Sequence, residues 1–357
     1  MPDLFDALAT PSLQLDNRLV MAPLTRNRAD EQGVPGDLAV EYYAQRATAG
    51  LIISEGTQPS AIGQGYPFTP GIHTPEQIAG WRRVADAVHA RGGRIVVQLM
   101  HVGRIAHPDS KHGLESIAPS QLQAPGEIFT TDGMQPHATP RALDLAEIPA
   151  VISDYVHAAR SAMEAGLDGV EVHAANGYLI HQFLAPGANH RTDLYGGSPA
   201  NRARFGIEVT RAIIDAIGAD KVGIRISPAH NIQGATEDDP ADVQATYDAL
   251  LEGIAPLGLS YLSILADPYA ELTQRLRKNF GGVVIANDGF ASVTTRESAQ
   301  AILDDDKADA VAVGRLFIAN PDLPARWAGD AELNEPNPAT FYGGGAEGYT
   351  DYPALSA

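Results

Sequence analysis

Eight short apolar runs, rich in valine and isoleucine, recur along the 357-residue chain. Each run is continuously apolar and does not alternate with polar residues, a pattern typical of strands buried on both faces of a parallel sheet. We therefore predict the following strands: Leu19–Pro23, Leu51–Glu55, Ile95–Met100, Asp168–His173, Lys221–Ser227, Tyr261–Leu265, Val283–Asn287 and Ala310–Gly314.

Segments of helical character separate the runs, and two of them start with a capping residue followed by proline, Thr74-Pro75 and Ser198-Pro199. A strand followed by a helix, eight times over, favours a (β/α)8 TIM barrel of the α/β class; the alternative is an open Rossmann-like sheet. No segment has the composition of an interdomain linker, so we expect residues 1–357 to form one domain. The predicted helices are Leu38–Ala49, Pro75–Ala90, Ile148–Ala165, Ala200–Ile217, Ala241–Pro256, Tyr269–Asn279, Thr294–Leu303 and Pro321–Trp327.

Two segments depart from this alternation. Residues 101–144 follow the third predicted strand and are rich in proline, glycine, serine and histidine. A segment of that length is usually functional or contains small elements of its own, and on a barrel it lies on the catalytic face. We predict that it forms a lid or a pocket wall, and that the tail from Asn334, rich in glycine, proline and tyrosine, packs across the barrel.

Charge and composition exclude several classes of partner. The formal net charge of −19 would repel DNA and anionic membranes, so we expect neither nucleic acid nor membrane as a partner. Cysteine is absent, which excludes disulfides, iron–sulfur clusters, thiolate zinc sites and a cysteine nucleophile. His101, His107, Asp109 and His112 match no standard metal-ligand spacing, so no metal is expected. The acidic start lacks a signal-peptide core and no apolar run has the length of a membrane span, which predicts a soluble, cytoplasmic protein.

Polar side chains gather where the predicted strands end, on the face of a barrel that carries the chemistry of barrel enzymes. Seven of the eight ends supply groups for directional hydrogen bonds, which a purely structural barrel would not require. We therefore predict an active site at this face. The strand-end residues are Thr25, Arg26, Thr57, Gln98, His101, His173, Asn176, Tyr178, Arg225, Asn287, Asp288 and Arg315.

The last two strand ends indicate a phosphate site. Gly289, Gly314 and Arg315 follow the seventh and eighth predicted strands, where barrels commonly bind phosphate. The glycines allow backbone N–H groups to approach a phosphate closely, and the guanidinium can neutralise its charge. Each glycine taken alone could equally be an ordinary turn residue.

His173 and Asn176 are three residues apart, so on a tight turn both can point the same way. Such a pair can donate two hydrogen bonds to one carbonyl or nitro oxygen. A single histidine at a strand end is more often a hydrogen-bonded core residue. The ordered set of His173, Asn176 and Tyr178 favours a catalytic role instead.

A phosphate-binding barrel lyase or isomerase without a flavin is a second function class that fits these features. Such an enzyme needs a Schiff-base lysine or paired carboxylates at strand ends, and neither occurs among the strand-end residues above. Residues 343–348 match the dinucleotide fingerprint Gly-x-Gly-x-x-Gly, but they follow no predicted strand and begin no predicted helix. We therefore expect no nucleotide there. The lysines of the chain are Lys111, Lys221, Lys278 and Lys307.

Five longer motifs are specific enough to indicate a family: MAPLTR (21–26), EVHAANGY (171–178), HQFL (181–184), NHRTDLYGGS (189–198) and FYGGG (341–345). In this order they resemble the Old Yellow Enzyme family over nearly the whole chain, and most closely its bacterial branch with N-ethylmaleimide reductase and pentaerythritol tetranitrate reductase. The resemblance implies a barrel that binds FMN tightly but non-covalently. It also implies electrons from NADPH or NADH and reduction of activated C=C bonds in enones, enals, maleimides and nitroalkenes.

The resemblance implies cofactor roles for individual residues. Pro23, Leu24 and Thr25 match the contacts to the flavin ring, and Thr25 would hydrogen-bond the flavin C4 carbonyl. Gln98 would bind the pyrimidine edge of the ring. Arg225 would lie near N1 and the C2 carbonyl, where a fixed cation stabilises the charge that gathers on reduction. The other implied cofactor-binding residues are Gly56, Asn287, Gly289, Gly314 and Arg315.

The resemblance also implies a catalytic set. His173 and Asn176 would bind the activating oxygen of the substrate while its β-carbon receives hydride from flavin N5. Tyr178 would then protonate the α-carbon, because the enolate that it meets is a strong base. The residues implied in substrate binding are His173, Asn176, Tyr66, Met100 and Tyr342.

Two residues and one segment depart from the family pattern. Gly56 stands where relatives often have alanine, and Met100 replaces a tryptophan, which should enlarge and soften the pocket. The segment 266–271 after the sixth predicted strand is shorter than in the closest relatives. A non-catalytic flavin-binding or redox-sensing barrel would use the same cofactor residues without turnover, and both a monomer and a dimer are compatible with the sequence.

Overall fold

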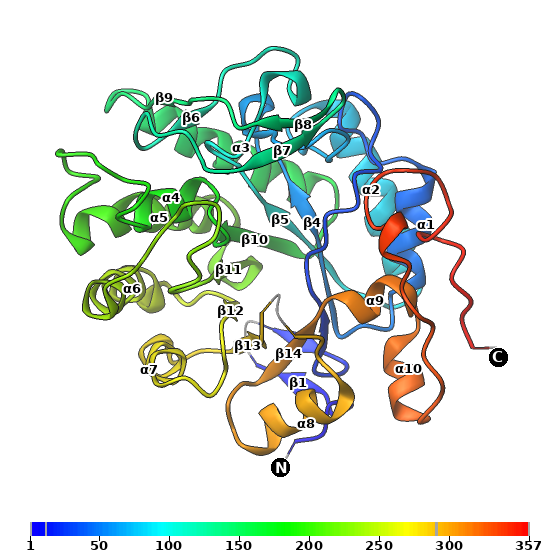
Figure 1. The fold of residues 1–357 in the computed structure, drawn as a ribbon. Helices are drawn as coiled ribbons and strands as arrows, with labels where there is room; N and C mark the ends of the chain where they lie inside the picture. Colours follow the sequence, from blue (N-terminus) through cyan, green and yellow to red (C-terminus); the bar gives the residue numbers. More distant parts are fainter. Residues whose placement is uncertain (1, 11–12, 290–291, 356–357) are drawn as a thin grey trace.

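The part of the chain that the computed structural model describes, residues 2–10, 13–289 and 292–355, forms a closed barrel of eight parallel strands (Figure 1). Consecutive barrel strands pair with each other, and the last strand pairs with the first. The predicted (β/α)8 barrel is therefore confirmed, and the open sheet was the wrong alternative. The strands are β3 (Leu19–Met21), β4 (Leu51–Thr57), β5 (Ile95–Leu99), β10 (Gly169–Ala174), β11 (Val222–Ile226), β12 (Tyr261–Leu265), β13 (Val284–Asn287) and β14 (Ala310–Val313).

Helices surround the barrel on its outer side (Figure 1). Both predicted cap residues begin a helix: Thr74 accepts a hydrogen bond from the Gln77 N–H, and Ser198 accepts one from the Asn201 N–H. These bonds satisfy N–H groups that have no partner inside the helix. The helices in the predicted positions are α1 (Asp37–Gln45), α2 (Pro75–His89), α3 (Ile148–Glu164), α5 (Pro199–Ile217), α6 (Pro240–Ile254), α7 (Glu271–Phe280), α8 (Arg296–Asp304) and α10 (Leu323–Ala328).

Two short helices beside the strand ends were not predicted. α4 (Leu179–Leu184) follows β10, and α9 (Arg315–Ala319) follows β14 directly. Neither is long enough to show a helical period in its sequence. Among the described residues, no helix combines the length and the apolar character that crossing a membrane requires.

Apolar side chains fill the amino end of the barrel. Leu51 at the start of β4 and Val283 just before β13 belong to one buried cluster with Ile285. The same cluster includes a leucine from each strand of a hairpin, β1 (Leu8–Ala9) and β2 (Gln14–Leu15), which the sequence did not predict. The hairpin therefore covers this end, and the polar strand-end residues lie at the opposite end.

The segment 101–144 contains small elements of its own, as its length suggested. Strand β6 (Ile117–Ala118) pairs with β9 (Arg141–Ala142), and a separate hairpin joins β7 (Glu127–Thr130) and β8 (Gly133–Pro136) above the barrel strands in Figure 1. Met100 and apolar residues of this segment form a buried cluster, against which Tyr66 and Tyr178 pack. The segment thus forms a wall beside the strand ends.

The tail after Asn334 packs over the barrel, as predicted, within the residues that the structure describes up to 355. The guanidinium of Arg26, completely buried, donates hydrogen bonds to the carbonyl oxygens of Phe341 (2.9 Å) and Gly348 (2.7 Å). The ring of Tyr349 stacks on that of Tyr42, with 4.1 Å between the ring centroids. These contacts hold the tail across the mouth of the barrel.

We expect the buried His101 to make stability depend on pH. Burial, with Lys111 as a second cause, lowers the pKa of His101 to about 3, whereas an unfolded chain titrates near 6.5. Between these values the unfolded state binds more protons, so stability is present above about pH 6.5 and is lost as the pH falls.

His101→Asn should flatten this dependence by at most about 1.4 kcal/mol per pH unit, measured by urea unfolding between pH 7 and 4.5. The control is His112→Asn, because His112 is exposed. Identical slopes in the wild type and His101→Asn would contradict the assignment.

Candidate active site

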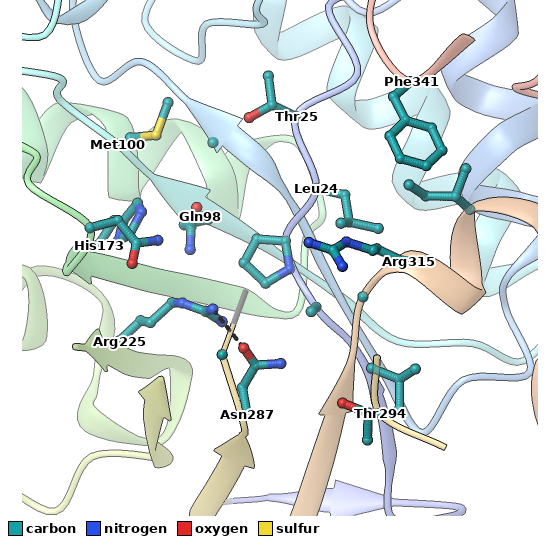
Figure 2. A pocket seen from close by; sticks show the side chains of 18 of the residues that line it. Leu24, Thr25, Gln98, Met100, His173, Arg225, Asn287, Thr294, Arg315 and Phe341 are labelled. Carbon is teal, nitrogen blue, oxygen red and sulfur yellow. Dashed lines mark hydrogen bonds between the residues drawn. The ribbon is translucent and has the colours of Figure 1, made fainter. Parts of the chain in front are cut away.

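A cavity of about 340 Å³ lies at the carboxyl ends of the barrel strands (Figure 2). Tyr66, the one predicted site residue that does not line it, contacts it through a 3.1 Å hydrogen bond to the Tyr178 hydroxyl. The structure thus brings the residues predicted from eight separate segments to one place. The predicted residues that line the cavity are Pro23, Leu24, Thr25, Gly56, Gln98, Met100, His173, Asn176, Tyr178, Arg225, Asn287, Gly289, Gly314, Arg315 and Tyr342.

Gln98 on β5 is held in one orientation. Its side-chain Nε2 donates a 2.7 Å hydrogen bond to Glu171 Oε1, and its backbone N–H donates to Ser54 Oγ at 3.1 Å. Glu171 is completely buried on the neighbouring strand β10. Because a carboxylate can only accept, the amide nitrogen of Gln98 faces Glu171 and its oxygen is left to accept from a donor in the cavity.

Arg225 on β11 is a buried cation at the cavity wall. Its Nη2 donates to Asn287 Oδ1 at 3.3 Å, the bond drawn in Figure 2. No group in the described part of the chain bonds its Nε or Nη1. Burial lowers the pKa of Arg225, and the nearby Glu171 carboxylate opposes this effect. A buried guanidinium with unused donors is suited to a ligand with carbonyl oxygens or negative charge.

His173 and Asn176 line the same cavity, as their spacing suggested. Asn176 adopts the left-handed region, with φ of 59°, which asparagine tolerates better than most residues. Its backbone is fixed by a bond from its N–H to Ser227 Oγ (2.8 Å) and by one to its carbonyl from Gln233 Nε2 (2.8 Å). His173 Nδ1 and Asn176 Oδ1 are buried without a partner among the described residues.

Burial sets the protonation states of the candidate catalytic groups. It lowers the pKa of His173 well below its usual value, and the neighbouring Arg225 and His181 lower it further, so the imidazole is neutral. Burial also raises the pKa of Tyr178, which keeps the phenol protonated. The rings of His173 and Tyr178 meet edge to face, 5.1 Å apart. The cavity is therefore lined by a neutral imidazole, the side-chain amide of Asn176 and a phenol that retains its proton.

The glycines of the cavity differ in what surrounds them. Among the described residues, a Cβ at Gly289 would meet nothing within 4 Å and one at Gly314 would meet only the Leu24 side chain at 3.6 Å; Gly289 has φ of 104°. A methyl group at Gly56 would instead collide with the sulfur of Met100. The two departures from the family pattern are thus linked, because Met100 occupies the space that an alanine at 56 would need.

Several residues of the site were missed from the sequence. Gln233 lines the cavity from the loop after β11, and Thr294 does so from the loop after β13. Glu171 accepts a hydrogen bond from the Gln98 side chain and was also missed. Its carboxylate within the otherwise apolar run of β10 was the sequence signal that could have identified it. Arg26 and His101, which also stand at predicted strand ends, do not line the cavity. The first binds the tail and the second is buried beside the loop wall.

Comparison with protein families identifies relatives along nearly the whole chain. The model of the NADH:flavin oxidoreductase / NADH oxidase family matches residues 3–334. The chain is 41% identical over 378 residues to 12-oxophytodienoate reductase 7 of Oryza sativa subsp. japonica, over 99% of this chain and 94% of that protein. It is also 41% identical over 351 residues, 96% of this chain and 94% of that protein, to a protein of Leishmania infantum named "Probable flavin mononucleotide-dependent alkene reductase".

Solved structures are similar in fold as well as in sequence. The old yellow enzyme homologue from Zymomonas mobilis superposes with a TM-score of 0.94 at 42% identity, covering 99% of this chain and all (100%) of that one. Morphinone reductase in complex with tetrahydroNAD superposes with a TM-score of 0.93 at 49% identity, covering 100% of this chain and 98% of that one.

Ligand binding tests whether His173 and Asn176 act together as hydrogen-bond donors. Removing both, in the double variant His173→Ala/Asn176→Ala, should weaken the binding of a phenol such as p-hydroxybenzaldehyde about 30-fold, because two hydrogen bonds contribute about 1 kcal/mol each. Spectrophotometric titration measures the dissociation constant. The double variant His112→Ala/Asn279→Ala, at exposed positions outside the cavity, is the control. Unchanged affinity in the first variant would show that these side chains do not bind the ligand oxygen.

Proposed function

The chain belongs to the NADH:flavin oxidoreductase / NADH oxidase family and is an NAD(P)H-dependent FMN oxidoreductase, and we propose that it is an ene-reductase acting on enones, enals, maleimides and nitroalkenes. The observation that carries the proposal is the pair of donors from His173 and Asn176 in one cavity with the hydroxyl of Tyr178. When bound, FMN supplies the redox chemistry, accepting hydride from the nicotinamide and passing hydride to the alkene.

The residues at the cavity fit FMN. A flavin ring is planar and carries, at one edge, carbonyl and nitrogen acceptors together with an N–H donor. The acceptors match the unused donors of Arg225, and the N–H matches the side-chain oxygen of Gln98. We assign the phosphate to Gly289, Gly314 and Arg315, where the described residues leave space beside the glycine backbone. The cofactor would be held tightly without a covalent bond, in a single barrel domain.

His173 and Asn176 would bind the carbonyl or nitro oxygen of the substrate. Two hydrogen bonds to this oxygen withdraw electrons from the conjugated C=C bond and leave its β-carbon electrophilic. The neutral state of His173 suits this role, because a protonated imidazole would add a further positive charge beside Arg225. The rigid backbone around Asn176 keeps the two donors at a constant separation.

Tyr178 would deliver the proton to the α-carbon. Its raised pKa makes it a weak acid, but the enolate formed from an enone is strongly basic, so the transfer is favourable. A hydrogen bond between the hydroxyl oxygens of Tyr66 and Tyr178, 3.1 Å apart, positions the Tyr178 hydroxyl. NADPH or NADH would use the same cavity in a separate half-reaction, which makes the reaction ping-pong; a nicotinamide analogue is bound in the related morphinone reductase structure.

The cofactor assignment predicts that the purified protein is yellow and releases one FMN on denaturation. Arg315→Ala should weaken FMN retention about tenfold or more, because it removes a charge-assisted contact of about 1.5–3 kcal/mol. Equilibrium dialysis followed by chromatography of the released flavin measures this. Arg211→Ala on the exposed face of α5 is the control. Recovery of FAD, or no flavin after reconstitution, would overturn the assignment.

The proton donor predicts a selective effect on one half-reaction. Tyr178→Phe keeps the ring and its packing but deletes the hydroxyl. Stopped-flow measurement with cyclohexenone should show an oxidative half-reaction slowed about 10²–10⁴-fold, with flavin reduction by NADPH nearly unchanged. A nitroalkene should be affected less, because its nitronate product can leave before protonation. Slowing of flavin reduction alone would assign the proton transfer to another group.

A further inference from the structure

A second, larger cavity of about 920 Å³ adjoins the catalytic one. The two share Thr25, Tyr178 and Tyr342, so they are continuous at the residue that we assign as proton donor. In the proposed function a small enone such as cyclohexenone would lie beside the flavin ring, against His173, Asn176 and Tyr178 of the inner cavity. The residues that line the outer cavity are Thr25, Asn27, Arg28, Ala29, Tyr66, Pro67, Phe68, Phe129, Tyr178, Tyr342, Gly343 and Gly344.

Exposed aromatic rings gather at the outer cavity. Among the described residues, the exposed large aromatic side chains are Phe68 (38%), Phe129 (57%), Tyr269 (48%) and Tyr342 (68%). All of these except Tyr269 line the outer cavity, although they come from three segments far apart in the sequence. Aromatic surface left in water at one concave place is a mark of a binding site for an apolar ligand.

Each of these rings is held by its own segment. Phe68 has φ of 57°, an unfavourable conformation for a residue with a side chain, and its carbonyl accepts a 3.0 Å hydrogen bond from the Ala29 N–H. Phe129 pairs with Met134 across the β7–β8 hairpin. The backbone at Phe68 and at Phe129 is therefore held by contacts within the protein.

The segment that carries Tyr342 is anchored by Arg28. Its guanidinium donates to the backbone carbonyls of Gly345 (3.0 Å) and Thr340 (2.9 Å), on either side of Tyr342. It also donates to the carbonyls of Arg26 and Glu347. The N–H groups of the Arg28 guanidinium are thus hydrogen-bonded to backbone carbonyls of the protein.

We propose that the outer cavity binds an aromatic or similarly bulky apolar group attached to the alkene, so that extended enones such as diaryl enones are substrates. The reacting double bond would lie in the inner cavity, and the distal ring would lie among Phe68, Phe129 and Tyr342. This inference rests on the proposed ene-reductase function and adds a substrate class to it.

The adenosine half of NAD(P)H is the competing occupant, and the charges disfavour it. Its phosphates would need cationic partners, yet the donors of Arg28 are bonded to backbone carbonyls and the chain carries a net charge of −19. The outer cavity offers aromatic contact area, and Arg28, the one cation among the described residues of its lining, already directs its N–H groups to backbone carbonyls. An apolar group therefore fits the outer cavity better than a dinucleotide.

The test compares two enones on the FMN-loaded protein, cyclohexenone and 1,3-diphenylpropenone. Phe129→Ala and Phe68→Ala should each lower kcat/KM for the diaryl enone about 3- to 10-fold, the scale of one aromatic contact, and change that for cyclohexenone less than twofold. Phe129→Trp should restore the diaryl rate. The control is Tyr269→Ala, which removes an exposed ring elsewhere and should change neither enone.

The outcomes separate the two proposals. If the wild type reduces cyclohexenone but not the diaryl enone, or if the variants change both enones equally or neither, the outer cavity does not select substrates. If the variants instead weaken NADPH in the reductive half-reaction and leave the diaryl enone unchanged, the cavity holds the dinucleotide and the inference is wrong. If the wild type binds FMN and reduces neither enone, the ene-reductase proposal fails first.

Discussion

The burial of Arg225 and Glu171, which attract each other electrostatically from neighbouring barrel strands, is the constraint on which the arrangement of the pocket depends. Removing ions from water costs several kcal/mol each, so both groups need partners inside the barrel. Glu171 accepts from Gln98, and Arg225 donates to Asn287, which leaves Arg225 Nε and Nη1 without a partner in the described chain. A ligand with acceptor oxygens at this edge completes the set. The hydrogen bonds that these two groups make therefore also orient Gln98 and Asn287 at the cavity.

The barrel makes this arrangement possible because its strands deliver side chains to fixed places. Gln98, Glu171 and Arg225 stand on three consecutive strands whose register is set by backbone pairing, so their separations do not depend on loop conformation. The proposed substrate-binding residues lie partly on loops, and there the backbone is fixed by hydrogen bonds, as at Asn176. The proposed cofactor-binding residues on the strands are positioned by backbone pairing, whereas the proposed substrate side depends more on the loops.

The sequence predicted the strands well because burial on both faces leaves an unbroken apolar run, and strand ends then locate the polar residues. It missed α9 because five residues show no period. The β7–β8 hairpin could have been predicted from a local turn signal, Asp132-Gly133, where Gly133 adopts φ of 97°. The outer cavity could not have been predicted, because Phe68, Phe129 and Tyr342 meet only through tertiary contacts. The link between Gly56 and Met100 likewise appears only when their side-chain space is compared.

Burial also connects the two halves of the proposed chemistry. It lowers the pKa of His173 and raises the pKa of Tyr178, so the same low-dielectric surroundings keep both groups uncharged. An uncharged imidazole can donate to the substrate oxygen without competing with Arg225 for the anionic charge that develops. An uncharged phenol still has its proton when the enolate forms. A more open pocket would bring the pKa of His173 back toward its usual value, so the wall of residues 101–144 and the tail contribute to the proposed chemistry as well as to the fold.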